Sequence, residues 1–321
     1  MRKRILSGIQ PTNKIHLGNY FGAIRQHIAM QQEGEPFYFI ANYHALTSVQ
    51  EAARLRDLTL DIAIDYLSLG LDPEKSVLFK QSDVPEVTEL TWLLATVTGM
   101  GLLERAHSYK DKIAKGIAPG VGLFIYPVLM AADILIYQSD IVPVGVDQVQ
   151  HIEMAQDMAG YFNNIYGEVF KRPEAKLSST PKVPGTDGQK MSKSYKNTIE
   201  VFAEGNILKK AVMGIVTDSL PVEAPKDPET NTVYQLYSLF VSENERREMA
   251  ERFVAGGYGY GDAKKKLLQK VDEYFASARE KRKELEKNRD YVEEVLRKGG
   301  ERARNEARQT LSKARKYCGI D

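Results

Sequence analysis

Cysteine is nearly absent from this chain, which holds only Cys318 in 321 residues. A single cysteine excludes an internal disulfide and any zinc or iron–sulfur site built from several cysteines. Long apolar runs are also lacking: the longest, residues 122–137, is interrupted by Pro127 and Asp133, so we expect no membrane span. The basic start MRKRILSGIQ has no apolar run of the signal-peptide kind. We therefore expect a cytoplasmic protein with no membrane partner, no iron–sulfur cluster and no zinc.

The chain also lacks an excess of either charge, since 44 lysines and arginines face 43 aspartates and glutamates. The charge is unevenly distributed, because residues 279–321 hold 14 basic and 9 acidic side chains. A basic surface there suits a polyanion such as RNA. Charge considered by itself favours a simpler interpretation, a solvated helix face with ion pairs between successive turns.

The first 165 residues alternate short β-rich runs with helical patterns. The β-rich runs predict strands at residues 4–9, 37–41, 76–80 and 141–144. The stretches between them predict helices at residues 19–32, 51–69, 85–97, 127–138 and 148–165. This alternation is typical of the α/β class, with a parallel sheet covered by helices on both faces. Ligands of such sheets bind beyond the carboxyl ends of the strands, where the turn at residues 10–18 falls.

The second half of the chain has a different character. Residues 171–194 are rich in Pro, Gly, Ser and Lys without an apolar period, which predicts a long functional loop. Helical patterns then predominate, at residues 200–213, 232–241, 243–254, 262–297 and 301–317. Glycines predict breaks between helices at residues 255–262 and at Gly299–Gly300. We therefore expect boundaries near residues 186, 198 and 300.

Two short motifs point to an anionic ligand. GIQPTNKIHLGNY, from Gly8 to Tyr20, places a turn, a histidine and Gly18 before a helix, which directs free backbone N–H groups at an anion. His16 adds a donor, and Gly18 permits close approach to the backbone. KMSKS at residues 190–194 holds two lysines in a polar loop, and mobile ammonium groups of this kind suit a triphosphate. Without the first motif, two lysines in a polar loop would indicate only an exposed basic loop.

These motifs, in this order and about 170 residues apart, resemble the two signatures of class I aminoacyl-tRNA synthetases. With YPVLMAADILIYQSDIVPVGVDQVQHIEMAQDMA at residues 126–159, the whole chain is similar to the bacterial tryptophanyl-tRNA synthetase family. The resemblance implies a Rossmann-like catalytic domain at residues 1–186, a mobile loop at 187–198, a helical anticodon-binding domain at 199–300 and a C-terminal helix at 301–321. It further implies a homodimer that uses tryptophan, ATP with Mg²⁺, and tRNA(Trp). We then expect basic side chains between residues 262 and 317 to contact the tRNA, among them Arg302, Arg304, Arg308 and Lys313.

In such a reaction the carboxylate of the amino acid attacks the α-phosphorus of ATP and pyrophosphate leaves. The nucleophile is already an anion and the leaving group needs no proton, so alignment and charge stabilisation are sufficient. His16 then serves as a donor to the phosphates rather than as a general base. By resemblance the catalytic residues are His16, Lys112, Lys190 and Lys193, with Lys110 a weaker candidate. The implied ATP contacts are Gln10, Pro11, Thr12, Gly18, Asn19, Gly145, Val146, Asp147, Val183, Lys190, Met191, Ser192, Lys193 and Ser194.

Asp133 is the candidate for substrate specificity. A carboxylate in an apolar stretch is costly unless it receives a donor, and the indole N–H of tryptophan is donor-only. Loss of such a bond discriminates strongly between substrates. The alternative is a carboxylate satisfied by a neighbouring Ser or Tyr. The other tryptophan contacts implied by the resemblance are Leu6, His44, Tyr126, Met130, Val142, Val144 and Gln148.

Some positions depart from the family pattern. They are Val146, Gln189, Ser108 and the residues NYHAL around His44. The closest alternative function is a tyrosyl-tRNA synthetase, which shares the fold and would place acceptors for a phenol. A nucleotidylyltransferase of small metabolites and an inactive tRNA-binding paralogue are more distant alternatives. The intact His16, Lys190 and Lys193 argue against the inactive paralogue.

Overall fold

A computed structural model describes residues 2–11, 14–106, 109, 120–177 and 182–321. By its internal contacts the chain forms two compact units. Unit 1 comprises residues 1–13, 26–178 and 285–321, and unit 2 comprises residues 14–25 and 179–284. This division differs from the expected boundaries, because residues 14–25 group with the second half of the chain and residues 285–321 group with the first.

The core of unit 1 is a five-stranded parallel sheet of order β3-β2-β1-β4-β5. The strands are β1 (Arg4–Ile9), β2 (Glu35–Ile40), β3 (Val77–Lys80), β4 (Ile141–Val144) and β5 (Glu174–Leu177). The parallel α/β fold predicted from the alternation is therefore confirmed. The strand order reverses between β1 and β4, which is where sheets of this class bind ligands at their carboxyl ends.

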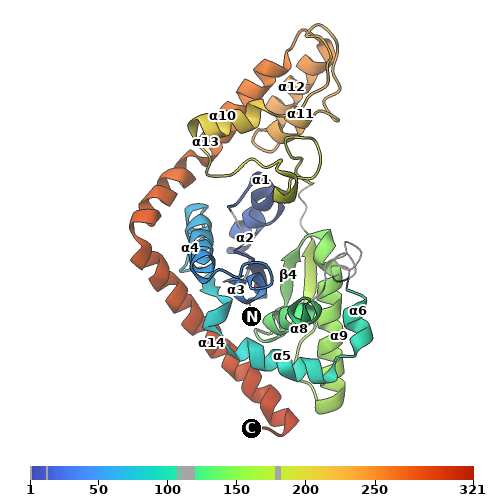
Figure 1. Cartoon of the computed structure of the whole chain (residues 1–321), viewed down its shortest axis with the longest axis vertical. Coiled ribbons are helices and arrows are strands. Elements are labelled where there is room, and N and C mark those ends of the chain that lie inside the picture. The colour runs from blue at the N-terminus through green and yellow to red at the C-terminus, as the bar shows by residue number, and fades with distance from the viewer. Residues whose placement is uncertain (1, 12–13, 107–108, 110–119, 178–181) are drawn as a thin grey trace. The chain divides into compact units, whose positions relative to one another are not determined.

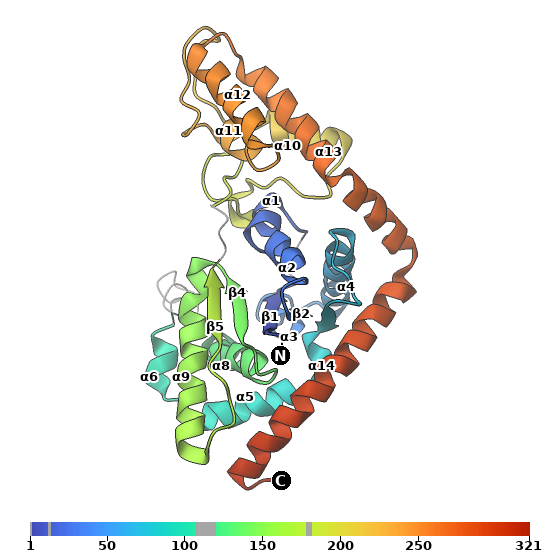
Figure 2. The ribbon, with the colours of Figure 1, turned by 180° about the vertical axis from the view of Figure 1, so that it is seen from behind.

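Both faces of this sheet are covered, as its apolar strands require. Alternate residues of the strands, among them Leu6, Phe37 and Phe79, pack with α5 (Glu86–Val97), α8 (Val121–Leu135) and α9 (Val149–Tyr166). On the other face Tyr38 stacks on His27 of α2 (Arg25–Met30). Among the residues that the structure describes, the other helices of this part of unit 1 are α3 (Asn42–Ala45), α4 (Ala52–Ser68) and α6 (Met100–Glu104) (Figures 1 and 2).

Two elements of unit 1 differ from the sequence prediction. β5 lies in a stretch that we predicted as loop. Its sequence EAKL contains no apolar run, and three of its four residues are exposed. α8 begins at Val121 rather than at Pro127, which lies inside the helix. Proline removes one helical hydrogen bond, but α8 packs against both α5 and α9, so burial of its apolar residues outweighs this loss.

The last helix corrects a further prediction. α14 runs without interruption from Arg289 to Cys318, whereas we predicted a break at Gly299–Gly300. Both glycines are buried where α14 crosses β3 and contacts α4 and α5 (Figure 1). A Cβ atom on Gly299 would lie 1.9 Å from the carbonyl oxygen of Leu78, and one on Gly300 would lie 2.9 Å from Cβ of Asp83. The glycines are therefore required by close packing rather than by a turn.

Ion pairs also hold α14 to α5. Glu86 at the start of α5 accepts from Nε of Arg304 at 2.7 Å and from Nε of Arg308 at 3.0 Å, and Arg315 pairs with Glu89. Burial by itself would raise the pKa of Glu86, but the hydrogen bonds from Arg304 and Arg308 bring it below its ordinary value. Two of the four cations expected to face RNA are thus engaged within unit 1.

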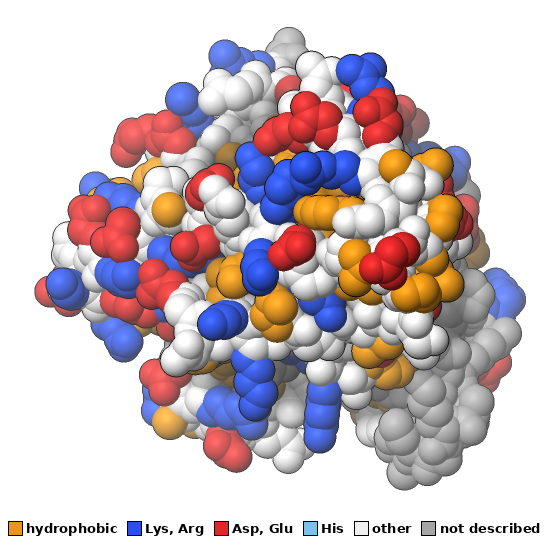
Figure 3. Space-filling model, turned by 90° about the horizontal axis from the view of Figure 1, so that it is seen from above, with side chains coloured by type: hydrophobic (Ala, Val, Ile, Leu, Met, Phe, Trp, Pro, Cys, Tyr) orange, Lys and Arg blue, Asp and Glu red, His pale blue; other side chains and the backbone are white. Residues whose placement is uncertain are grey.

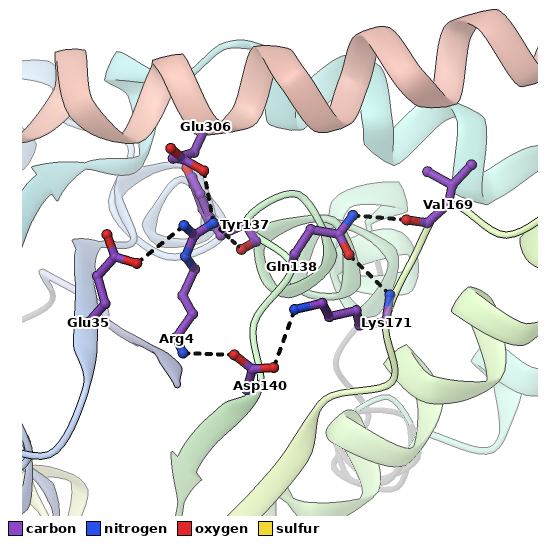
Figure 4. Close-up of polar contacts among 8 residues, drawn as sticks. All are labelled: Arg4, Glu35, Tyr137, Gln138, Asp140, Val169, Lys171 and Glu306. Carbon is purple, nitrogen blue, oxygen red and sulfur yellow. Dashed lines mark hydrogen bonds and ion pairs between the residues drawn. The ribbon is translucent and has the colours of Figure 1, made fainter. Parts of the chain in front are cut away.

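A polar cluster at the amino ends of the strands joins β1 to its neighbours (Figure 4). The Arg4 guanidinium donates to the Tyr137 carbonyl at 2.8 Å and to the Glu306 carboxylate of α14 at 3.0 Å. The cluster is completed by Glu35, Asp140, Lys171, Gln138 and Val169. α14 is therefore anchored at the end of the sheet opposite to the carboxyl ends.

Unit 2 is mainly helical. It contains α1 (Leu17–Asn19), a π-helical turn (Tyr20–Ile24), α10 (Gly205–Met213), α11 (Thr232–Tyr237), α12 (Glu243–Ala255) and most of α13 (Tyr260–Lys287). The predicted break between α12 and α13 is confirmed, with positive φ at Gly256 and Gly257. Tyr20 and Phe21 pack edge-on against the aromatic rings of Tyr274 and Phe275 in α13 and of Phe240, which follows α11. No helix in the described parts of the chain is long and apolar enough to cross a membrane.

Candidate active site

His16 is held as the N-cap of α1 by a reciprocal pair of hydrogen bonds. Its Nδ1 accepts from the backbone N–H of Asn19 at 3.3 Å, and the Asn19 side-chain oxygen accepts from the backbone N–H of His16 at 3.2 Å. Because Nδ1 is an acceptor, the ring proton lies on Nε2. Burial and, to a smaller extent, the charge of Lys193 lower the pKa of His16 to about 4. His16 is therefore a neutral N–H donor at neutral pH.

The first motif packs directly on the second. The backbone N–H of Leu17 donates to the Ile199 carbonyl at 2.9 Å, and the Val201 N–H donates to the Ile15 carbonyl at 3.0 Å. A Cβ atom on Gly18 would lie 2.9 Å from Nδ1 of His16 and 3.4 Å from Cβ of Met191. Residues 14–20 of the first motif, the KMSKS segment and the residues that follow it thus form one structural group within unit 2.

The KMSKS segment is ordered by Asn197, which is buried. The Asn197 side-chain oxygen accepts from the Ser192 N–H at 2.8 Å, and its amide donates to Asp187 at 2.7 Å and to the Lys190 carbonyl at 3.2 Å. The buried Val183 adds a carbonyl that accepts from the Met191 N–H at 3.0 Å. These bonds fix the backbone that carries the two lysines.

The lysines of this segment differ in their surroundings. Lys190 is exposed, whereas Lys193 is half-buried and its ammonium donates to the Lys14 carbonyl. Ser192 is half-buried and Ser194 is exposed. Lys193 therefore lies on the side of the loop that faces His16, while Lys190 can reach a ligand from solvent.

In unit 1 the predicted ATP contacts follow the carboxyl ends of two neighbouring strands. Gln10 and Pro11 follow β1, and Gly145 and Val146 follow β4. Asp147 belongs to the 3₁₀ turn Val146–Gln148, but its side chain lies outside what the structure describes. Thr12, Lys110 and Lys112 also lie outside the described residues.

Asp133 of α8 is fully buried and accepts hydrogen bonds at both carboxylate oxygens. Nε2 of Gln81 lies 2.8 Å from Oδ1 and 2.8 Å from Oδ2, and Nε2 of His44 lies 2.8 Å from Oδ2. Burial raises the pKa of Asp133, and the bonds from His44 and Gln81 oppose that shift. The carboxylate is satisfied by an amide and an imidazole rather than by the Ser or Tyr that we considered.

An open cleft of about 610 Å³ lies beside this network in unit 1. His44 and Tyr126 line it, and their rings meet edge-on at 6.4 Å. The Tyr126 hydroxyl lies 2.6 Å from Nε2 of His151, a buried residue of α9. Thr88, Thr91, Leu46 and Ile125 form part of the remaining wall.

The other predicted tryptophan contacts lie around Asp133 at differing depths. Leu6 and Val142 are buried in the core on the same side of the sheet as α8. Met130 and Val144 are partly buried against this core. Gln148 is half-buried at the end of its 3₁₀ turn.

The predicted residues thus fall into two groups. In unit 2 the structure brings together His16, Gly18, Asn19, Val183, Lys190, Met191, Ser192, Lys193 and Ser194. In unit 1 it gathers Asp133, His44 and Tyr126, with the apolar residues beside them.

Sequence reasoning missed Gln81 and His151. Gln81 could have been found, because it is the first residue after β3 and therefore lies at a ligand-binding end of the sheet.

Among the residues that the structure describes, no three His, Cys, Asp or Glu side chains are placed to hold a metal ion.

Comparison with known proteins identifies relatives of this chain. A model of the class I tRNA synthetases for tryptophan and tyrosine matches residues 2–276. The tryptophan–tRNA ligase of Rhodopirellula baltica is 57% identical over 318 residues, which cover 99% of each chain. That of Fusobacterium nucleatum is 56% identical over 320 residues, covering 99% of this chain and 98% of the relative. The crystal structure of tryptophanyl-tRNA synthetase from Campylobacter jejuni, complexed with ADP and tryptophan, has a TM-score of 0.93 at 49% identity and covers 98% of this chain and 99% of that one.

Proposed function

Because the chain belongs to the class I tRNA synthetases for tryptophan and tyrosine, we propose that its two groups of site residues have separate tasks in one reaction. The chain activates tryptophan with ATP to form tryptophanyl-adenylate and pyrophosphate, and then transfers tryptophan to its tRNA. A tyrosyl-tRNA synthetase is not favoured, since relatives at about half identity or more over the full length carry the tryptophan name.

The group in unit 2 is proposed to bind the phosphates of ATP. The observation that carries this proposal is that His16 is a neutral Nε2–H donor, held beside Lys193 by its own helix cap. A fixed neutral donor stabilises negative charge through its N–H group without first having to gain a proton. Lys190 and Lys193 supply mobile positive charge, and the loop at residues 187–198 is proposed to follow the pyrophosphate as it forms. Gly18 and Asn19, with Val183, would meet the nucleoside.

The group in unit 1 is proposed to bind tryptophan, with Asp133 accepting from the indole N–H. Leu6, Met130, Val142 and Val144 would form the apolar surroundings of the ring. Tyr126, Gln148 and His44 would hold the polar end of the amino acid or close over it. The ribose would meet the turn at residues 145–147, and Gln10 and Pro11 would contact ATP beyond β1.

Magnesium is proposed to enter with ATP as part of the substrate, coordinated mainly by phosphate oxygens and water. This mode suits Mg²⁺, which loses its water reluctantly and rarely occupies an all-protein cage. The proposed cellular location is the cytoplasm, where tRNA and ATP are supplied together.

A second copy of the chain is proposed to cover the apolar face of unit 1 formed by α5, α6 and the start of α8. Trp92 of α5 is 70% exposed and Val121 of α8 is 75% exposed, with Met100 of α6 and Ile125 of α8 also exposed. Large exposed apolar side chains in one region are typical of interfaces, and self-association usually gives a symmetric dimer.

Sedimentation analysis should show a dimer that Trp92→Glu converts to monomers. Ile207→Glu, at an equally exposed position of α10 in unit 2, is the matched control and should leave the dimer intact.

The helices of unit 2 are proposed to contact the tRNA, as the family resemblance implies for residues 199–300. On the face drawn in Figure 3, lysine and arginine side chains are interspersed with acidic ones. Recognition would therefore depend on particular cations rather than on a uniformly basic surface.

Amino-acid-dependent exchange between ATP and pyrophosphate tests the reaction. With each of the twenty amino acids in turn, only tryptophan should support rapid exchange. Rapid exchange with tyrosine instead would reject the proposed tryptophan site, and the absence of exchange with every amino acid would reject adenylate formation.

A further inference from the structure

Gln81 connects Asp133 to the segment that carries His44. Gln81 is 1% exposed and opens the 3₁₀ turn Gln81–Asp83 directly after β3. Its amide nitrogen lies 2.8 Å from each oxygen of Asp133. Its amide oxygen accepts from the backbone N–H of Tyr43 at 3.0 Å and of His44 at 3.4 Å. Both ends of the side chain are therefore used.

The orientation of this amide is determined by its backbone partners. Backbone N–H groups can only donate, so the side-chain oxygen of Gln81 must face α3. The amide N–H must then face Asp133, and the alternative orientation, with nitrogen and oxygen exchanged, is excluded. Asp133 consequently receives a donor from Gln81 and is held as an acceptor.

The hydrogen bonds also determine which lone pair of Asp133 is available. An ionised carboxylate offers about two acceptor positions on each oxygen. Oδ2 accepts from both Gln81 and His44, whereas within the described residues Oδ1 accepts from Gln81 only. The remaining acceptor position is therefore on Oδ1.

We propose that Gln81 is a positioning residue for substrate specificity, which holds Asp133 so that one free lone pair of Oδ1 selects a ligand carrying an N–H donor. This inference rests on the proposed function, since it takes Asp133 as the group that meets the indole. A ligand of the same shape without the donor leaves a buried acceptor unpaired, and that loss is the source of discrimination.

The experiment compares tryptophan with 3-(benzothiophen-3-yl)alanine, in which sulfur replaces the indole N–H. ATP–pyrophosphate exchange measures kcat/KM for each amino acid, and the ratio of the two values is the preference for the donor. In the unmodified protein the ratio should be about a hundred or more. Asp133→Asn should reduce it strongly, because an amide can present N–H groups to the indole.

Gln81→Glu is the decisive variant. A carboxyl group of the same size still accepts from the backbone N–H groups of Tyr43 and His44, but two buried carboxyl groups this close together share one proton, so Asp133 is no longer held as a full carboxylate acceptor. We expect the preference ratio to fall at least about tenfold, through loss of tryptophan activation, while the KM for ATP is little changed. Gln81→Leu, which removes both halves of the amide, should reduce the ratio as well. The matched control is Gln31→Leu, because Gln31 is a buried amide whose partners are Gly70, Asp72 and Ser76.

The outcomes separate the two claims. If the unmodified protein shows no preference for tryptophan over the sulfur analogue, the assignment of Asp133 is wrong and the role of Gln81 with it. If the preference is present and Asp133→Asn abolishes it, while Gln81→Glu keeps it, only the role of Gln81 is wrong. A fall in the ratio that Gln31→Leu reproduces would show a general structural effect and would also overturn the role of Gln81.

Discussion

Gly299 of α14 lies directly over the carbonyl group of Leu78 in β3, so that a Cβ atom at position 299 would be 1.9 Å from the Leu78 oxygen. The helix and the strand therefore meet backbone to backbone, and neither can yield as a flexible side chain would. Gly299→Ala should lower the free energy of unfolding by about 3 kcal/mol, the upper end of the usual overpacking range. Urea denaturation of the purified variant measures the change.

Gly261→Ala is the control for this substitution. Gly261 lies in the first turn of α13 and is exposed, and a Cβ atom there would have no neighbour within 4 Å among the described residues outside its own helix backbone. Alanine there should be neutral or stabilise the protein by up to about 1 kcal/mol through helix propensity. Equal effects of the two substitutions would contradict the close packing of α14 on β3.

The glycine pair also illustrates why some elements were predictable and others were not. β1 and β4 were predicted with their observed bounds, because short runs rich in Ile, Leu and Val are typical of buried strands. Gly299–Gly300 was interpreted as a break, because a sequence does not reveal that a helix must approach a strand backbone. β5 was missed for a related reason, since its four residues EAKL contain no apolar run and gain their strand conformation from pairing with β4.

The candidate site, too, was only partly predictable from the sequence. The two motifs could be recognised from their residues and their order, and Asp133 could be singled out as a carboxylate within an apolar stretch. The partners of that carboxylate could not, because Gln81 and His44 come from separate segments that meet only in the folded sheet. The pairing of residues 14–25 with residues 179–284 is likewise a product of tertiary contacts, such as Leu17 with Ile199.

Two buried histidines should make stability depend on pH in acid. Burial lowers the pKa of His27 to about 4, and burial together with the charge of Lys193 lowers that of His16 to about 4, from an ordinary value of 6.5. Between these values the unfolded chain binds more protons than the folded one, so the free energy of unfolding should fall as the pH is lowered from about 6.5 to about 4. Below about pH 4 this contribution should be constant.

Denaturation curves at several pH values test this dependence. His27 stacks on Tyr38 and its Nδ1 lies 3.0 Å from the Tyr66 hydroxyl, so His27→Phe keeps the stacking and removes the titration. The variant should have a smaller slope of stability against pH over the same window. A slope unchanged from that of the original chain would show that His27 binds its proton equally well in both states.

Lys193 should act on the chemical step rather than on tryptophan binding. Its ammonium matters most where pyrophosphate charge develops, so Lys193→Ala should lower the rate of adenylate formation about a hundredfold and leave the tryptophan KM nearly unchanged. Single-turnover measurement of adenylate formation separates these effects. Lys182→Ala is the control, because Lys182 is an exposed lysine just before the buried Val183 and lies outside the motif. A raised tryptophan KM with an unchanged rate would reject the proposed role.

The cations that contact tRNA can be distinguished from those that hold α14 in place. Arg304 and Arg308 pair with Glu86, whose side chain is only 10% exposed, so their reversal to Glu should destabilise unit 1. Arg302 and Lys313 lie on the exposed side of the same helix, and Lys209 and Lys210 are exposed on α10 of unit 2. Reversal of either exposed pair should leave ATP–pyrophosphate exchange and stability unchanged.

Aminoacylation at several salt concentrations then shows which pair faces the RNA. Each lost phosphate contact removes counterion release, so the reversed pair should raise the KM for tRNA and make its salt dependence shallower by about one unit of logarithmic slope per contact. Because α14 is engaged with the sheet of unit 1, we expect this effect from Lys209→Glu with Lys210→Glu, and little effect from Arg302→Glu with Lys313→Glu. The reverse result would mean that the solvent face of α14 contacts tRNA, as we first expected for basic side chains between residues 262 and 317.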